Sequence, residues 1–166
     1  MRLTGKVLEL SGIDPRRLDL EWVSSAEAQR FADVATAISD TVTGIGPLDR
    51  DRYGFVLEAA RRTLDSEAVR WTVGKEKAIT DKGDVYGRSW GVEGYESVLD
   101  SVAREELEKN MICVALRRGC KSVRDVGSMT GMELSRISFL MADLERTGAI
   151  QFTGMKHHKP EFEAVS

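Results

Sequence analysis

Two cysteines and two histidines have the most versatile chemistry in this chain. Cys113 and Cys120 lie seven positions apart, a spacing that matches neither a zinc site nor a disulfide framework. His157 and His158 are adjacent, so on a strand they point to opposite sides and cannot hold one metal ion together. We therefore expect two reduced thiols in the core, and no metal or cofactor bound by this chain.

Catalytic motifs are lacking around these residues. The sequence has no Gly-x-Ser-x-Gly elbow, His-Glu-x-x-His pair, Cys-x-x-Cys motif or Walker loop, the arrangements that activate nucleophiles, bind zinc or cradle phosphates. Glu27 follows two serines and suits the first turn of a helix better than general-base chemistry. We predict no catalytic residue, and no enzymatic activity of this chain by itself.

Composition narrows the class of partner. The 166 residues carry a net charge of −3, which does not favour general binding to nucleic acid or to an anionic membrane. No apolar run approaches the roughly 20 residues that span a bilayer, and no basic and then apolar leader is present. We expect a cytoplasmic protein without membrane contact.

A helix and a strand are predicted at the start of the chain. Apolar side chains keep helical spacing in residues 3–10, and Gly12 supplies the left-handed residue that ends such a helix. Residues 18–23 then alternate, with Leu18, Leu20 and Trp22 on one side, which is the period-two pattern of a half-buried strand. A single strand leaves its backbone N–H and C=O groups without partners, so this fragment should need more sheet than the chain provides.

A second helix should follow this strand. Ser24 or Ser25 is placed to cap it, with Glu27 in its first turn. Its apolar positions predict one buried face, made of Ala28, Phe31, Val34, Ala35, Ile38 and Val42. Helix, strand and helix together predict the last third of an α/β layer.

Three sequence words in this region occur in a fixed order: Gly12-Ile13, Leu-Glu-Trp-Val-Ser-Ser-Ala-Glu at 20–27, and Gly46-Pro47. In this order they resemble the C-terminal half of the iron–sulfur delta subunit of methyl-viologen-reducing hydrogenase and heterodisulfide reductase complexes. In that family the cysteines that hold the [2Fe–2S] cluster precede this segment, and they have no counterpart here. Two distant thiols cannot replace four cluster ligands.

The resemblance implies an accessory, electron-transfer-associated subunit of a hydrogenase- or heterodisulfide-reductase-type complex, with no cluster in this chain as given. We expect Trp22, Ser24, Glu27 and Phe31 to dock on its redox subunits. If Met1 is an internal methionine, the protein extends upstream to the cluster cysteines, and a [2Fe–2S] cluster is then expected. A selenocysteine codon read as stop would produce such a start.

The middle of the chain predicts a connector. Apolar spacing over residues 55–64 indicates one amphipathic helix, begun by the polar cap region 49–52, and glycines interrupt the periodicity after residue 74. Trp71 and Tyr86 carry too much apolar area to remain free in solvent. We expect both to anchor small clusters.

The last sixty residues predict three helices and a hairpin. Ser122 is placed as an N-cap with Asp125 three residues later, and Gly131 provides the turn into a third helix. That helix should bury Ile137, Met141 and Leu144. Gly148 ends it, and residues 149–153 read as a strand that turns at Gly154. This order resembles the winged helix-turn-helix domain.

The exposed face of the third helix decides between protein and DNA as its partner. Phe139 and Leu140 are expected there and suit a protein contact, whereas Arg136, Lys156 and Lys159 could contact nucleic acid. The face carries more acid than base, so we favour docking on a redox partner. The alternative is a winged-helix transcription regulator that binds DNA, and a homodimer is compatible with either.

The expected fold class is therefore α+β and mainly helical. An incomplete α/β fragment at 1–47 should be followed by a helical connector at 48–105 and a winged helix-turn-helix domain at 106–166.

Overall fold

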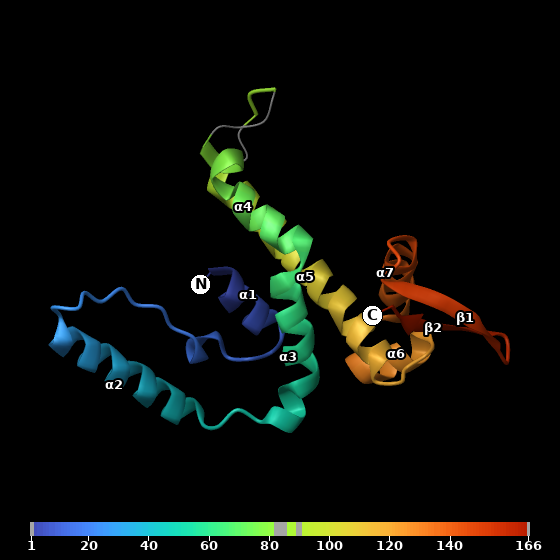
Figure 1. The fold of residues 1–166 in the computed structure, drawn as a ribbon, viewed down its shortest axis with the longest axis horizontal. Helices are drawn as coiled ribbons and strands as arrows, with labels where there is room; N and C mark the ends of the chain where they lie inside the picture. The colour runs from blue at the N-terminus through green and yellow to red at the C-terminus, as the bar shows by residue number, and fades with distance from the viewer. Residues whose placement is uncertain (1, 82–85, 89–90, 166) are drawn as a thin grey trace.

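The computed structural model describes residues 2–81, 86–88 and 91–165. They form helices and one two-stranded antiparallel sheet, which confirms the prediction of a mainly helical α+β fold (Figure 1). The elements in chain order are α1 (Arg2–Leu10), η1 (Pro15–Arg17), α2 (Ala28–Ile45), α3 (Arg50–Asp65), α4 (Glu67–Asp81), α5 (Gly91–Arg117), α6 (Val123–Thr130), α7 (Leu134–Arg146), β1 (Ile150–Lys156) and β2 (Lys159–Ala164).

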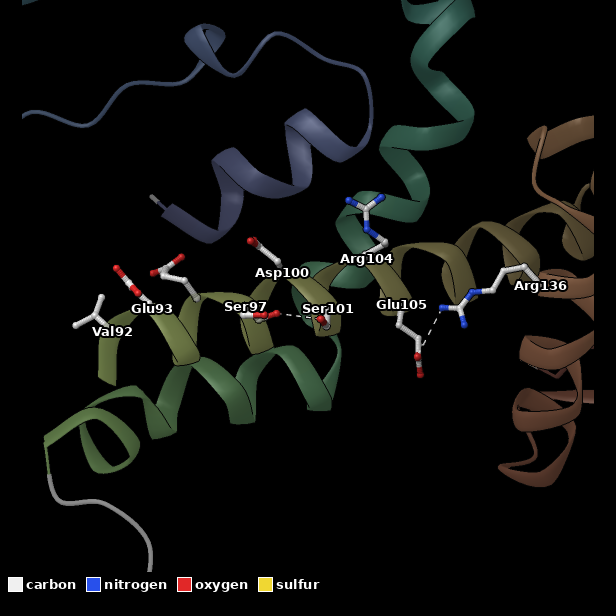
Figure 2. Close-up of a pocket in the computed structure, with 9 residues that line it drawn as sticks. Val92, Glu93, Ser97, Asp100, Ser101, Arg104, Glu105 and Arg136 are labelled. Atoms are coloured by element: carbon white, nitrogen blue, oxygen red, sulfur yellow. Dashed lines mark hydrogen bonds and ion pairs between the residues drawn. The ribbon is translucent and has the colours of Figure 1, made fainter. Parts of the chain in front are cut away.

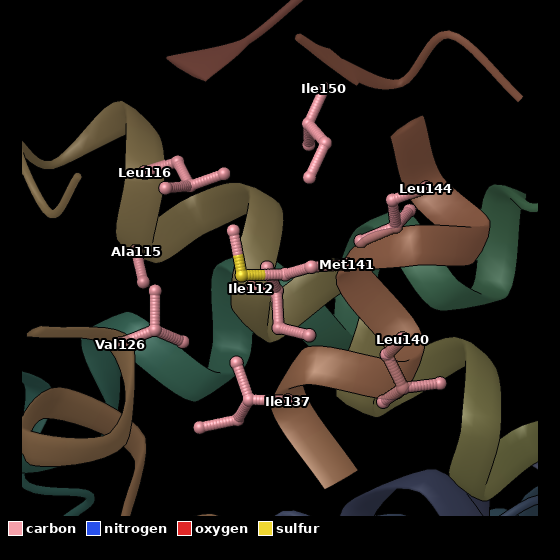
Figure 3. Close-up of a cluster of buried hydrophobic side chains, with 9 residues drawn as sticks. All are labelled: Ile112, Ala115, Leu116, Val126, Ile137, Leu140, Met141, Leu144 and Ile150. Atoms are coloured by element: carbon pink, nitrogen blue, oxygen red, sulfur yellow. The ribbon is translucent and has the colours of Figure 1, made fainter. Parts of the chain in front are cut away.

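Helix α5, 27 residues long, is the central helix against which most other elements pack. It packs against α1, α3 and α4, and also against α6, α7 and β2. Two buried apolar clusters form along it. The first consists of Val7, Ala59, Ala60, Ala103, Leu107 and Val114. The second joins α5, α6, α7 and β1 and consists of Ile112, Ala115, Leu116, Val126, Ile137, Leu140, Met141, Leu144 and Ile150 (Figure 3).

The middle of the chain is more regular than its glycines indicate. Asp49 caps α3 by accepting hydrogen bonds from the backbone N–H groups of Asp51 and Arg52, as its position predicts. Helix α4 continues through Gly74, because one glycine costs a helix only about 1 kcal/mol and packing on α5 offsets that cost. The division of the chain at residues 47 and 105 stays a prediction.

The prediction that Trp71 and Tyr86 anchor small apolar clusters is wrong. Trp71 is 59% exposed and Tyr86 is 79% exposed. In α4 the buried positions are Val69 and Thr72, and Trp71 projects from the opposite side of the helix. Among the described aromatic residues of this region, Tyr95 of α5 is buried instead, and its hydroxyl donates to the backbone oxygen of Thr72 at 3.3 Å.

The first helix forms as predicted, and the strand after it does not. Helix α1 ends before Gly12, whose φ of 70° is left-handed. Residues 18–23 form neither helix nor strand, with Leu20 and Trp22 exposed to solvent. The reason is that the described part of the chain offers these residues no partner strand.

Helix α2 also differs from its prediction. It begins at Ala28, so Glu27 is the N-cap residue and lies outside the first turn. None of its side chains is fully buried, and Phe31 is 65% exposed. The physical reason is that α2 packs mainly on the single turn η1, which is too small to cover the apolar face of an 18-residue helix.

The predicted helix cap, left-handed glycine and buried helix face of the C-terminal region are confirmed. Ser122 and Asp125 form a capping box at the start of α6, and Gly131 has a left-handed φ of 73°. The predicted core face of α7, Ile137, Met141 and Leu144, is buried.

The hairpin is longer than predicted. Strand β1 continues past Gly154 to Lys156, and the chain reverses at His157 and His158, which have φ values of 49° and 62°. Gly154 lies instead where the register shifts by one residue, as in a β-bulge. The prediction of a turn at Gly154 is therefore wrong, since a bulge absorbs the glycine within the strand.

Candidate functional site

Residues 18–45, here called the N-terminal arm, extend away from the rest of the molecule (Figure 1). The arm is fixed at its root. Ile13, just before it, is buried, and the Arg17 guanidinium donates to the backbone oxygen of Gly46 at 2.8 Å. Asp14 caps η1 and accepts hydrogen bonds from the side chain and backbone N–H of Arg16, which lower the pKa of its carboxyl to about 2. Both ends of the arm therefore leave from one ordered root.

The arm exposes large apolar side chains. Trp22 is 81% exposed, Phe31 65% and Leu20 53%. A cavity of about 500 Å³ lies at the base of the arm, between η1, Leu18 and the Ile38 side of α2. Exposed apolar area of this kind marks surfaces that other proteins cover. The structure thus brings two of the predicted docking residues, Trp22 and Phe31, onto one arm with their side chains accessible.

The other two predicted docking residues shape the arm itself. The Glu27 carboxylate accepts a hydrogen bond from the backbone N–H of Ser24 at 2.9 Å, which closes the turn before α2. Arg30 lies 3.4 Å from a Glu21 oxygen and 3.7 Å from a Glu27 oxygen. These contacts join the extended segment to the first turns of α2.

The second predicted surface, on α7, needs one correction. Phe139 is 64% exposed, as expected, but Leu140 is fully buried in the core cluster. Leu140 follows Ile137 by three residues and precedes Leu144 by four, so it lies on the same helical face. Phe139 remains the accessible apolar residue of the pair, and the Arg136 guanidinium lies over its ring at 5.8 Å.

Arg136 is held by acidic side chains of α5. Its guanidinium lies 2.7 Å from a Glu108 oxygen and 3.6 Å from a Glu105 oxygen. It lines a groove of about 700 Å³ together with Glu93, Asp100 and other α5 residues (Figure 2). Lys156 and Lys159 are exposed at the end of the hairpin. A phosphate at Arg136 would have to displace two carboxylates.

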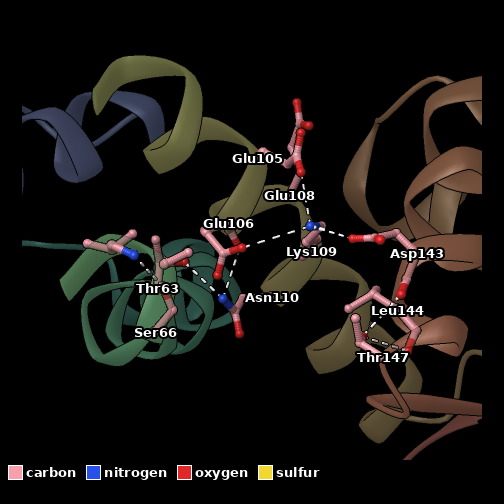
Figure 4. A network of polar contacts seen from close by, with 12 residues as sticks. Thr63, Ser66, Glu105, Glu106, Glu108, Lys109, Asn110, Asp143, Leu144 and Thr147 are labelled. Carbon is pink, nitrogen blue, oxygen red and sulfur yellow. Dashed lines mark hydrogen bonds and ion pairs between the residues drawn. The ribbon is translucent and has the colours of Figure 1, made fainter. Parts of the chain in front are cut away.

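A polar network that the sequence did not reveal holds α7 on α5 (Figure 4). Lys109 lies 2.6 Å from an Asp143 oxygen and 2.9 Å from a Glu105 oxygen. Burial lowers the pKa of Lys109, but the hydrogen bonds to Asp143 and Glu105 outweigh it and the pKa is raised. Asn110 donates to the Thr63 hydroxyl at 3.3 Å and so links α5 to α3. Asp143 and Thr63 lie far from their α5 partners in sequence, so no local signal could identify these two contacts.

The two cysteines pack against the C-terminal core and are free. Burial raises the pKa of both the Cys113 and the Cys120 thiols, which disfavours the thiolate that binds iron. Within residues 2–81, 86–88 and 91–165, no group of three or more His, Cys, Asp or Glu side chains could hold a metal ion. The donor set present does not fit a [2Fe–2S] cluster, which requires four ligands. In the same ranges, no helix has the length and apolar character needed to cross a membrane.

Comparison with known proteins finds a family match that includes α1, η1 and the arm. Residues 1–46 match the family described as methyl-viologen-reducing hydrogenase, delta subunit. A 51-residue stretch is 39% identical to an iron-sulfur subunit of the F420-non-reducing hydrogenase of Archaeoglobus profundus, which covers 31% of this chain and 37% of that relative. The chain therefore spans little more than a third of that relative's length. No solved structure matches the chain.

Proposed function

We propose that this chain is an accessory, electron-transfer-associated subunit of a hydrogenase- or heterodisulfide-reductase-type complex, which docks on a redox partner through its N-terminal arm. One observation carries the proposal. The residues that match the hydrogenase delta family include those that form the arm and leave Trp22 and Phe31 uncovered. Similarity and exposed apolar area thus coincide in one segment.

Burial of these side chains supplies the driving force for docking. Covering a large apolar side chain contributes about 1.5–3 kcal/mol, so Leu20, Trp22 and Phe31 are the anchors that we assign to this contact. Residues 18–23 make no backbone–backbone hydrogen bond to either described strand, β1 or β2. A sheet edge on the partner would pair with them, and this would produce the strand that the alternating sequence predicts.

In this proposal the arm supplies contact, and the redox cofactors belong to the partner subunits. The donor set described above does not fit a cluster, so no electron-transfer step is assigned to this chain. Its contribution is to position the subunits that carry out the redox chemistry.

The C-terminal unit, α5 to β2, supports a second contact in the same complex. Its order of helices and hairpin resembles that of a winged helix-turn-helix domain. Phe139 is exposed on α7, whereas Arg136 is engaged by Glu105 and Glu108. We propose that this face docks on protein, since a DNA contact would need free cations there.

Co-expression with the hydrogenase subunits of the source organism tests the proposal. The double substitution Trp22→Ser with Phe31→Ser should weaken association by at least about tenfold, as measured by co-purification and then by titration of the purified subunits. Trp71→Ser is the matched control, because Trp71 is also a large exposed aromatic residue but lies outside the arm. Full association of the double variant, or equal loss in the control, would contradict the proposal.

A DNA-binding assay separates the docking function from the regulator. We expect no sequence-selective duplex binding at physiological salt. Selective binding that is abolished by Arg136→Ala and insensitive to Phe139→Ser would establish the regulator instead.

A further inference from the structure

Charge is distributed unevenly along this chain. The arm, residues 18–45, carries five acidic side chains and one basic side chain, a net charge of −4, whereas the whole chain carries −3 and the remainder therefore +1. The acidic residues are Asp19, Glu21, Glu27, Asp33 and Asp40. The one cation, Arg30, contacts Glu21 and Glu27. Asp33 accepts a hydrogen bond from Gln29 at 2.9 Å, and among the described residues neither Asp33 nor Asp40 is in an ion pair.

Asp33 and Asp40 form an acidic face on α2. They are seven residues apart, which is two helical turns, and so they lie on one side of the helix. At 3.6 residues per turn this side is opposite the one that carries Phe31 and Ile38. The acidic face is exposed, and it is separate from the apolar face that the proposed redox partner would cover.

The end of the hairpin carries the opposite charge. Lys156 and Lys159 are directly paired across the two strands, although like charges in opposite positions destabilise a hairpin. The two residues between them, His157 and His158, both have left-handed φ values, as a two-residue hairpin turn requires. An anionic surface facing this tip would compensate the repulsion between the two lysines.

A bulge aligns apolar side chains beside this tip. Strand β2 places Pro160 and Phe162 on one face, and the register pairs them with Met155 and Phe152. Met155 is an odd number of residues from Phe152, so a regular strand would turn it to the other face. The register shift between Phe152 and Gly154 brings it back. Phe152 is 48% exposed and Met155 63%.

Helix α2 and the end of the β1–β2 hairpin lie toward opposite ends of the molecule's longest axis (Figure 1). Two copies placed side by side in opposite directions would bring each tip to the α2 helix of the other copy. Such a pairing is closed and uses the same two surfaces twice.

We propose that this chain self-associates in this antiparallel manner, with Lys156 and Lys159 of one copy against Asp33 and Asp40 of a second copy. Phe152 and Met155 then lie against the exposed Ala37, which flanks the acidic face. The pairing leaves the apolar side of the arm open and does not depend on the proposed function. Because exposed ion pairs contribute little and are screened by salt, the dimer is weak, with a Kd on the order of 100 µM at low salt.

Sedimentation equilibrium of the full chain tests this pairing. Dimer formation should be visible at about 20 mM salt, with a Kd that rises at least about fivefold at about 300 mM. Lys156→Glu with Lys159→Glu should weaken it by about tenfold, and so should Asp33→Lys with Asp40→Lys. The four substitutions together should restore the wild-type Kd within about threefold, because the charges are exchanged.

The matched control is Lys75→Glu with Lys77→Glu, an equal change of charge at two exposed positions of α4, which should leave the Kd at low salt within about twofold of wild type. Circular dichroism of each variant confirms that the fold is retained. A monomer at all concentrations and salts would overturn the proposal. The proposal would also be overturned by a dimer whose Kd is unchanged by the hairpin or the α2 substitutions. A variant with all four substitutions that stays monomeric would overturn it as well.

Discussion

The N-terminal arm and the C-terminal unit use the same kind of sequence pattern with opposite outcomes. Helix α2 carries an apolar face at helical spacing, and so does α7. Helix α7 buries Ile137, Leu140, Met141 and Leu144, while α2 buries none of its side chains completely. The difference lies in what each helix meets: α7 contacts α5, α6 and β1, and α2 mainly η1. An amphipathic sequence predicts that one face of a helix will be covered. Whether another part of the same chain covers that face depends on the tertiary structure.

The largest expected difference between the two regions is in local stability. Backbone amides of α5 to α7 should exchange with solvent only on global unfolding, whereas those of α2 should exchange by local opening that costs only a small part of that free energy. Hydrogen exchange followed by mass spectrometry measures this directly. Equal protection of residues 28–45 and 123–146 in the monomer would remove the contrast.

Truncation of apolar side chains should reproduce the contrast in free energy. Leu140→Ala removes a fully buried side chain of α7 and should lower the free energy of unfolding by about 2–5 kcal/mol. Ile38→Ala removes a half-exposed side chain of α2 and should change it by less than about 1 kcal/mol. Urea titration of both variants checks the pair, and a similar loss in both would mean that the arm is packed in solution.

Glycine substitutions should differ in their net effect on stability between the two regions. A Cβ at Gly127 in α6 would lie 2.6 Å from Leu134 Cδ2, the end of a side chain that is 47% exposed and can turn aside. The cost of that shift and the gain in helix propensity oppose each other, so Gly127→Ala should change the free energy of unfolding by less than about 1 kcal/mol. A Cβ at Gly44 in α2 meets no atom within 4 Å. Gly44→Ala should therefore stabilise the helical conformation of α2 by up to about 1 kcal/mol and raise its helical content. Thermal unfolding and far-ultraviolet circular dichroism distinguish the two results.

The smallest expected effect concerns pH. Hydrogen bonds from Lys109 and Arg146 hold the pKa of the Asp143 carboxyl below its ordinary value. The stabilisation is therefore complete above that ordinary value of 3.8, and it is lost as the pH falls through the lowered folded value. Between about pH 6 and pH 3, the Tm of Asp143→Asn should fall less than that of the wild type.

Local signals were enough to predict several elements from the sequence. Gly12 after α1, Asp49 before α3, the Ser122 and Asp125 capping box and the left-handed Gly131 all occur where expected. In each case the residue acts on backbone groups within a few positions of itself. The core face of α7 was predictable for a similar reason, since helical periodicity is written into neighbouring residues.

Contacts between distant residues were decided only in the tertiary structure. Arg136 meets Glu108, and Lys109 meets Asp143, across gaps of 28 and 34 positions. Residues 18–23 have the pattern of a strand but stay unpaired, because a strand exists only through the hydrogen bonds of its neighbour. The sequence by itself determined caps, turns and helical faces, which depend on local geometry. Which faces are covered depended on what the chain brings against them in space.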